Sequence, residues 1–174
     1  MKLGLRRGTV ALEPHSSEWE RIAQQTIRVL REILQDAAVD IQHIGSTAIR
    51  GICAKPIIDI VIGTADFDAV SAKNAALAEN GFIFRGQDLP EQYLYVCGEN
   101  EIRTHHIHVV QYGSVAWNNY INLRDYLNTH PDDAKAYSDW KQSLAKQFPN
   151  DRETYTAMKS GMIQEILSKA GATV

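Results

Sequence analysis

Hydrophobic residues in the first two thirds of the chain follow two different spacings. Between Ser16 and Ala37 they recur every three or four positions, as on one face of an α-helix, and Glu18 and Glu20 supply an acidic first turn. Short apolar runs bounded by turn residues follow at residues 39–44, 56–62, 81–85, 93–97 and 103–111, and a further short strand is expected at residues 9–12. The pattern predicts a mixed sheet of about five strands.

Helical spacing also appears between the strands and dominates the last third of the chain. A helix capped by Asp66 or Asp68 is expected to end at Gly81. Three more helices are predicted: one marked by Trp117, Tyr120, Ile121 and Leu127, one that begins at Pro131, and one that Asn150 caps and Gly171 ends, with a buried stripe of Tyr155, Met158, Met162, Ile166 and Leu167. We therefore predict one α+β domain over residues 1–174, with a helical C-terminal half packed against the sheet.

Composition and charge narrow the class of protein. The 174 residues are 44% hydrophobic and 22% charged, as expected for a globular domain with its own core. The net charge of −3 argues against bulk binding of nucleic acid, but it is compatible with a local basic pocket for a small phosphorylated ligand. No apolar run approaches the ~20 residues of a membrane span. With no secretion signal, Cys53 and Cys97 are expected to be free thiols in the cytoplasm.

An acidic residue interrupts the apolar strand at residues 56–62. Strand alternation places Asp59 and Val61 on one face, and a carboxylate buried there without a partner would cost several kcal/mol. Thirteen residues before Asp59, the sequence Gly45-Ser46-Thr47 offers hydroxyl groups and a glycine that lets the backbone approach a phosphate closely. Asp59 either pairs with one arginine or caps a nearby loop, or the loop and the acid together form a site for phosphate or nucleotide chemistry.

Histidines form the second candidate cluster. His106 and His108 share one face of the strand at residues 103–111 with Thr104, while His105 lies on the other face. Their side chains are expected to stand roughly 6 to 7 Å apart. Such a pair can bind one metal ion, contact phosphate oxygens, act as general acid and base, or only form hydrogen bonds within the sheet.

Several cationic residues are candidates to bind phosphate. Lys55 precedes a proline, which holds its backbone extended between the Gly-Ser loop and Asp59. Arg103 lies at the start of the histidine strand, and Arg124 lies at the edge of a helix face. Tyr155 and Lys159 share one face of the final helix with Arg152.

The run HIGSTAIRGICAKPIIDI, together with RTHHIHVV, RDYL and the terminal Tyr155 and Lys159, resembles the GrpB family. The resemblance extends from about Val10 to Ile166. Members of that family occur alone and also fused behind some dephospho-CoA kinases. The resemblance implies a nucleotidyltransferase-like fold, in which a mixed sheet carries a Gly-Ser loop and an acidic strand.

The chain departs from active nucleotidyltransferases at the metal-binding positions. Those enzymes follow the loop with two acids on one strand face and a third acid on a later strand, and the three acids hold two Mg²⁺ ions. Here Gly45, Ser46 and Asp59 match the pattern, but Val61 occupies the position of the second acid, and histidines stand where the third is expected. A standard two-Mg²⁺ site is therefore poorly supported, because Mg²⁺ prefers carboxylates and water.

Three hypotheses follow. In the first, a diverged transferase moves a nucleotidyl or phosphoryl group to an unknown acceptor, and the cations and hydroxyl that hold the phosphates are Ser46, Lys55, Arg103 and Arg124. Asp59 then binds one metal ion or acts as the catalytic base, and His106 and His108 replace the missing metal charge. In the second, Asp59, His106 and His108 bind Zn²⁺, Mn²⁺ or Fe²⁺. In the third, the protein binds a nucleotide or a CoA-like ligand without catalysis. All three place Ser46, Lys55, Asp59 and the paired histidines in one cleft. The candidate partner is a nucleotide or a small phosphorylated molecule, and the candidate metals are Mg²⁺, Mn²⁺ and Zn²⁺.

Overall fold

The computed structural model describes residues 3–172. In chain order, its first elements are β1 (Leu5–Arg6), α1 (Glu18–Leu34), the 3₁₀ turn η1 (Gln35–Ala37), β2 (Asp40–Ile44), the 3₁₀ turn η2 (Ser46–Ala48), β3 (Ile58–Thr64), α2 (Phe67–Ser71) and α3 (Asn74–Glu79). The remaining elements are β4 (Ile83–Leu89), β5 (Gln92–Cys97), β6 (Ile102–Arg103), β7 (His105–Gln111), α4 (Val115–Thr129), α5 (Pro131–Gln147) and α6 (Arg152–Lys169).

The main sheet has five strands in the order β2-β3-β7-β5-β4, which confirms the predicted mixed sheet. Only β3 and β7 run parallel; the other neighbours are antiparallel. In the parallel pair, Asp59 is the register partner of His106. Strands β1 and β6 form a separate two-stranded sheet.

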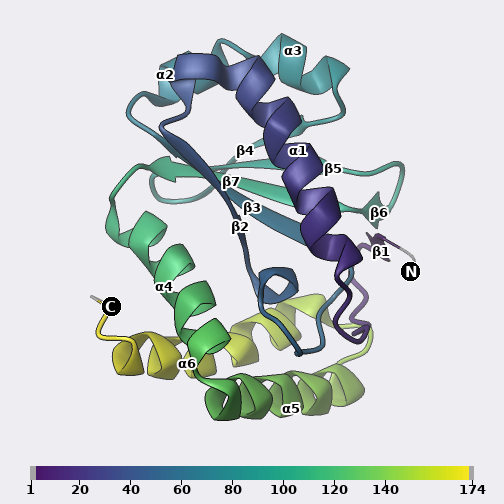
Figure 1. Ribbon diagram of the computed structural model, residues 1–174. Helices are drawn as coiled ribbons and strands as arrows, with labels where there is room; N and C mark the ends of the chain where they lie inside the picture. Colours follow the sequence, from purple (N-terminus) through teal and green to yellow (C-terminus); the bar gives the residue numbers. More distant parts are fainter. Residues whose placement is uncertain (1–2, 173–174) are drawn as a thin grey trace.

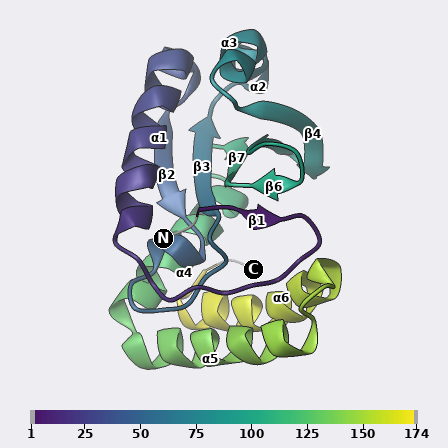
Figure 2. The same cartoon turned by 90° about the vertical axis from the view of Figure 1, so that its right-hand side faces the viewer.

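The two faces of the sheet bury different partners. Ile58, Ile60 and Ile62 point into the main core, where helix α1 packs with Trp19 and Leu30. Figure 1 shows α1 running diagonally across this face, and Figure 2 shows the same helix from the side. The opposite face of β3 packs on α4, and in both views α5 and α6 lie side by side beyond the end of the sheet. A space bounded by the sheet and three helices results on this face.

The helical C-terminal half follows the prediction. Pro131 occupies the first turn of α5, where its missing N–H costs no hydrogen bond. Leu127, Tyr137 and Ile166 join α4, α5 and α6 in one core cluster. Gly171 has a positive φ of 70° just beyond α6, as predicted for the residue that ends it. No helix within residues 3–172 is long and apolar enough to cross a membrane.

Four local predictions were wrong, two of them before residue 82 and two in the final helix. No strand forms at residues 9–12, because Val10 instead bonds through its N–H to Pro149 O at 2.8 Å and packs in a small C-terminal core. Asp66 does cap a helix, but the predicted single helix is split into α2 and α3 by a turn at Ala72 and Lys73. The Asp66 side chain accepts hydrogen bonds from the N–H groups of residues 68 and 69, which favours a tight first turn of α2.

The final helix differs from the prediction in two details. Asp151, not Asn150, is the cap, because its carboxylate accepts the N–H of Thr154. Met158 is 47% exposed rather than buried. Met158 does not line the cavity on the inner side of α6, and the buried residues of this helix are Tyr155, Ile166 and Leu167. Cys53 and Cys97 are free thiols, as predicted.

Candidate functional site

Asp59 and the two histidines form the centre of the site. The parallel register brings His106 Nδ1 to 3.1 Å from Asp59 Oδ1, and His108 Nε2 lies 3.7 Å from the same oxygen. The two imidazole rings are 6.3 Å apart between centroids, as the strand spacing predicts. The Asp59 side chain is 29% exposed, so one carboxylate with two imidazoles faces the space between the sheet and the helices.

The neighbours of the histidines indicate which ring nitrogens carry hydrogen. Arg152 Nη2 lies 3.4 Å from His106 Nε2, and a guanidinium can only donate. His106 Nε2 is therefore the acceptor, and Nδ1 donates its hydrogen to Asp59. On His108, the Gln92 amide nitrogen lies 3.5 Å from Nδ1, so Nε2 is the nitrogen that presents hydrogen to Asp59. Burial by itself raises the pKa of Asp59, but the hydrogen bonds from both histidines outweigh it and hold this pKa well below its usual range.

Helix α4 holds His108 in place. The ring of Tyr120 stacks on His108 with the centroids 5.3 Å apart, and its hydroxyl donates to Gln92 Oε1 at 2.8 Å. Gln92 also donates to Asp88 Oδ1 at 3.1 Å. This chain of contacts fixes the plane of the imidazole without using its Nε2, which remains directed at Asp59.

The Gly-Ser loop is built directly against Asp59. Gly45 has φ 69° and ψ −170°, a conformation that is essentially restricted to glycine. A Cβ atom at this position would lie 2.7 Å from Asp59 Oδ2. The glycine therefore allows both a backbone conformation and a close approach, and Ser46 and Thr47 continue from it as the 3₁₀ turn η2.

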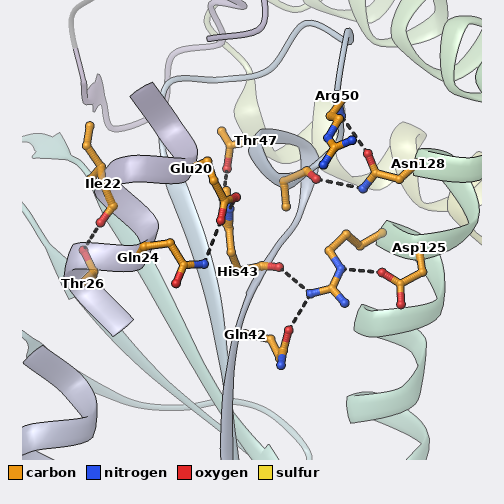
Figure 3. A network of polar contacts seen from close by, with 12 residues as sticks. Glu20, Ile22, Gln24, Thr26, Gln42, His43, Thr47, Arg50, Asp125 and Asn128 are labelled. Carbon is orange, nitrogen blue, oxygen red and sulfur yellow. Dashed lines mark hydrogen bonds and ion pairs between the residues drawn. The ribbon is translucent and has the colours of Figure 1, made fainter. Parts of the chain in front are cut away.

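A buried histidine that the sequence prediction missed supports the loop from behind. His43, 4% exposed, contacts Glu20 Oε2 through Nδ1 at 3.0 Å and Thr47 Oγ1 through Nε2 at 2.9 Å (Figure 3). Burial lowers the pKa of His43, although the Glu20 carboxylate opposes this effect. The loop is thus linked through a neutral imidazole to helix α1.

His43→Ala is expected to lower the free energy of unfolding by about 2 kcal/mol, because it leaves a cavity and an unpaired Thr47 hydroxyl. Urea unfolding followed by circular dichroism measures this change. His15→Ala is the control, because His15 is exposed and makes one edge-on ring contact, with Trp19. Equal losses in the two variants would contradict the supporting role of His43.

Arg124 braces the same region but does not reach the site. Its guanidinium donates to Gln42 Oε1 at 2.9 Å and to His43 O at 3.0 Å, and it pairs with Asp125 at 2.7 Å. Arg124 does not line the cavity at Asp59, because α4 directs the side chain to the outer strand β2, and its role as a phosphate ligand remains a prediction. Arg103 does not line the cavity at Asp59 either, but it lines a neighbouring groove that includes His106.

A cavity of about 440 Å³ lies over Asp59, between the sheet and helices α4, α5 and α6. It brings together most of the residues singled out from the sequence, namely Gly45, Ser46, Thr47, Lys55, Asp59, His106, His108, Tyr155 and Lys159. Their predicted roles in catalysis and ligand binding remain predictions. The volume of the cavity falls in the range of small-molecule binding sites.

Four cationic side chains line this cavity: Lys55, Lys141, Arg152 and Lys159. We call it the lysine cavity. Within residues 3–172, Asp59 is the only carboxylate that lines it. The ammonium groups of Lys55 and Lys159 lie 5.2 and 5.9 Å from the ring centroid of Tyr155. At these distances the π-electrons of the ring attract both cations.

The lysine cluster shifts the ionisation of its members. Burial, together with the charges of Lys159 and Arg152, lowers the pKa of Lys55 to about 7. Burial and the charge of Lys159 likewise lower the pKa of Lys141 to about 7. Lys141 is only 1% exposed and donates a hydrogen bond to the carbonyl of Cys53. An anion that entered the cavity would relieve this repulsion.

Lys141 and Arg152 are site residues that the sequence prediction did not single out. Lys141 stands four residues after Tyr137 and three before Leu144, both of which are buried. A lysine at a core-facing position of a helix was therefore a usable signal. Arg152 was placed on the correct helix face, but its contact with His106 depends on how α6 meets β7, and helical spacing does not carry that information.

The residues do not fit a two-Mg²⁺ site. Val61 is fully buried against Ile44, Val110 and Trp117 and offers no ligand. Within the described part of the chain, no group of three or more His, Cys, Asp or Glu side chains is arranged to hold a metal ion. The metal sites predicted at Asp59, His106 and His108, for Mg²⁺, Mn²⁺ or Zn²⁺, stay predictions without structural support.

Sequence comparison identifies relatives along almost the whole chain. The sequence model of the family described as GrpB protein matches residues 9–169. Glutamate-rich protein GrpB of Alkalihalophilus pseudofirmus is 39% identical over 172 residues, which cover 96% of this chain and 99% of that protein. A UPF0157 protein of Streptomyces coelicolor is 36% identical over 168 residues, which cover 95% of this chain and 88% of that protein.

Solved structures agree with this assignment. The conserved protein GrpB from Enterococcus faecalis superposes with a TM-score of 0.83 at 25% identity, over 91% of this chain and 98% of that one. Terminal uridylyl transferase 4 from Trypanosoma brucei, solved with bound dUTP, superposes with a TM-score of 0.56 at 9% identity, over 92% of this chain and 56% of that one. The second likeness concerns the fold alone and confirms that it is nucleotidyltransferase-like.

Proposed function

Because the chain belongs to the GrpB family and has a nucleotidyltransferase-like fold, we propose that it binds a nucleotide-like ligand in the lysine cavity and transfers a nucleotidyl or phosphoryl group to an acceptor. The observation that carries this proposal is the convergence of four cations on one cavity beside a Gly-Ser loop and a single carboxylate. Phosphate oxygens are the anions that such a cavity suits best, because each ammonium or guanidinium group forms charge-assisted hydrogen bonds with them.

His106 is the proposed general base. Asp59 accepts the Nδ1 hydrogen of His106 and thereby orients the ring, so that Nε2 carries the lone pair. In the complex, Arg152 pairs with a phosphate oxygen and frees this nitrogen. The acceptor hydroxyl gives its proton to His106 Nε2, its oxygen forms a bond to phosphorus, and the bond from phosphorus to the leaving oxygen breaks. Lys55 and Lys159 balance the charge that develops on the phosphoryl oxygens.

Binding is tested first by calorimetric titration with ATP, UTP and CoA, once with EDTA and once with Mg²⁺ or Zn²⁺. Lys159→Met is expected to weaken binding at least tenfold, because it removes a charged contact to phosphate. Lys169→Met is the matched control on the same helix, where the lysine pairs with Asp133 outside the cavity, and it should bind as the unaltered protein does. Failure of all three ligands to bind, or equal affinities for the two variants, would contradict the proposal.

Turnover is tested separately from binding. The unaltered protein should release pyrophosphate or phosphate from a bound nucleotide when acceptors are supplied, whereas His106→Gln should bind but release none. His15→Gln, which changes an exposed histidine, controls for loss of stability. Release that persists in His106→Gln at the original rate would exclude this residue as the base.

One observation favours a second candidate function. The buried Val61 at the position of a second acid leaves the site without the carboxylates that active relatives of the fold use. Tight nucleotide binding without any release of phosphate or pyrophosphate in the unaltered protein would identify a non-catalytic nucleotide-binding or CoA-binding module.

A further inference from the structure

A second groove adjoins the lysine cavity at His106. Its volume is about 820 Å³. Four arginine side chains line it, namely Arg7, Arg85, Arg103 and Arg152, and we call it the arginine groove. His106, Arg152 and Thr156 line both spaces, so the groove and the cavity share one wall.

The backbone brings these arginines together from distant parts of the chain. Strand β1 pairs with β6, the strand that carries Arg103. Arg7 follows β1 and remains bonded beside β6 through its backbone N–H. The N–H of Arg152 donates to Gly8 O at 3.3 Å, which ties the start of α6 to the same segment. Arg85 comes from the edge strand β4.

The charge of the groove is not balanced internally. Within residues 3–172, none of the four arginines forms an ion pair with a carboxylate. Two acids also line the groove, but Asp151 is engaged by the N–H and hydroxyl of Thr154 as the cap of α6, and Glu153 is the only other one. Four arginines against two acids leave an excess of positive charge. Nearby guanidinium groups with no anionic partner are a binding surface for an anion, and their planar fork suits phosphate.

We propose that the arginine groove binds the acceptor and that this acceptor is a small phosphorylated molecule with a free hydroxyl group. This inference rests on the proposed function, because it assigns the second substrate of the same reaction. His106 is the only imidazole that lines both spaces within the described residues. A base that takes the acceptor proton must lie between the donor phosphates and the acceptor hydroxyl, and His106 has that position between the lysine cavity and the groove.

The test counts anion sites with inorganic pyrophosphate as the probe, which fits either cluster of cations. Calorimetric titration of the unaltered protein should give two sites per chain. Arg7→Gln with Arg85→Gln should weaken one site at least tenfold, and Lys159→Met should weaken the other. Arg28→Gln, an exposed arginine on α1 outside both spaces, is the matched control and should retain two sites.

The outcomes separate the two proposals. A single site that the double arginine variant leaves unchanged would overturn the groove, while the lysine cavity and its function stand. If the double arginine variant loses a pyrophosphate site and Lys159→Met weakens no site, the groove is supported and the lysine cavity is contradicted. Competition distinguishes the class of acceptor: if a single-stranded oligonucleotide displaces pyrophosphate from the groove at far lower concentration than a sugar phosphate does, a small-molecule acceptor is wrong.

Discussion

Gly45→Ala is expected to lower the free energy of unfolding by about 3 kcal/mol and the Tm by roughly 6–12 °C. Two separate costs contribute. The backbone at φ 69° and ψ −170° is strained for any residue with a side chain, and the new Cβ would lie 2.7 Å from Asp59 Oδ2 and 3.0 Å from Asp59 Cβ. Either the loop or the carboxylate must move, so nucleotide binding in the lysine cavity should be lost as well. Urea unfolding and calorimetric titration measure the two effects.

Gly51→Ala provides the matched control for this variant. Gly51 also has a positive φ, 74°, but a Cβ there would meet nothing within 4 Å. Its replacement should therefore cost only the backbone strain, about 1 kcal/mol, and should leave ligand binding intact. Equal losses of stability at the two glycines would show that the close approach of Gly45 to Asp59 does not contribute to the cost of the substitution.

Lys141→Met is expected to remove a pH dependence from stability. The ammonium group of Lys141 has a pKa of about 7 in the folded protein, against an ordinary value of 10.5 in the unfolded chain. Between these values the unfolded chain binds more protons, so the free energy of unfolding rises with pH, by roughly 1 kcal/mol per pH unit for this lysine. The penalty is complete below pH 7 and absent above about pH 10.5. Lys141→Met should therefore be more stable than the unaltered protein at pH 7, with the difference shrinking as pH rises.

Urea unfolding at pH 7, 8, 9 and 10 tests this expectation. The difference between the variant and the unaltered protein is the informative quantity, since Lys55 shifts in the same direction and other groups titrate in alkali. The hydrogen bond to the Cys53 carbonyl is also lost, which lowers the gain by about 1 kcal/mol at every pH. Lys146→Met, exposed on the same helix, should show a difference that does not vary with pH. If the difference in the free energy of unfolding between Lys141→Met and the unaltered protein does not vary with pH, the pKa of Lys141 is not lowered in the folded protein.

The sequence predicted the strands and their faces because side-chain alternation is a local property. Asp59 on one face of β3 and His106 with His108 on one face of β7 follow from period two alone. The contact between them does not, since it depends on the parallel register that pairs Asp59 with His106. The family resemblance supplied the fold in which such a pairing occurs, and the structure supplied the distance.

The predictions failed where a long-range contact decides the outcome. Arg124 was a candidate phosphate ligand at the edge of a helix face, but its helix meets the sheet at β2, so the guanidinium bonds to Gln42 and the carbonyl of His43. Residues 9–12 have a strand-like composition, yet the chain there binds Pro149 across the molecule rather than a strand neighbour. Helical spacing placed Tyr155 and Lys159 on one face correctly but could not reveal that this face borders a cavity.

The packing around Val61 also bears on how this protein can evolve. An acid at position 61 would place a second carboxylate beside Asp59 on the same strand face, and it would require only one amino-acid substitution. The side chain is fully buried against Ile44, Val110 and Trp117, so a carboxylate there would be desolvated in an apolar layer and would cost several kcal/mol. A metal site with a second acid here would also require changes in the packing of helix α4 against β3. A substitution at position 61 alone would therefore not give a stable two-acid site on this strand face.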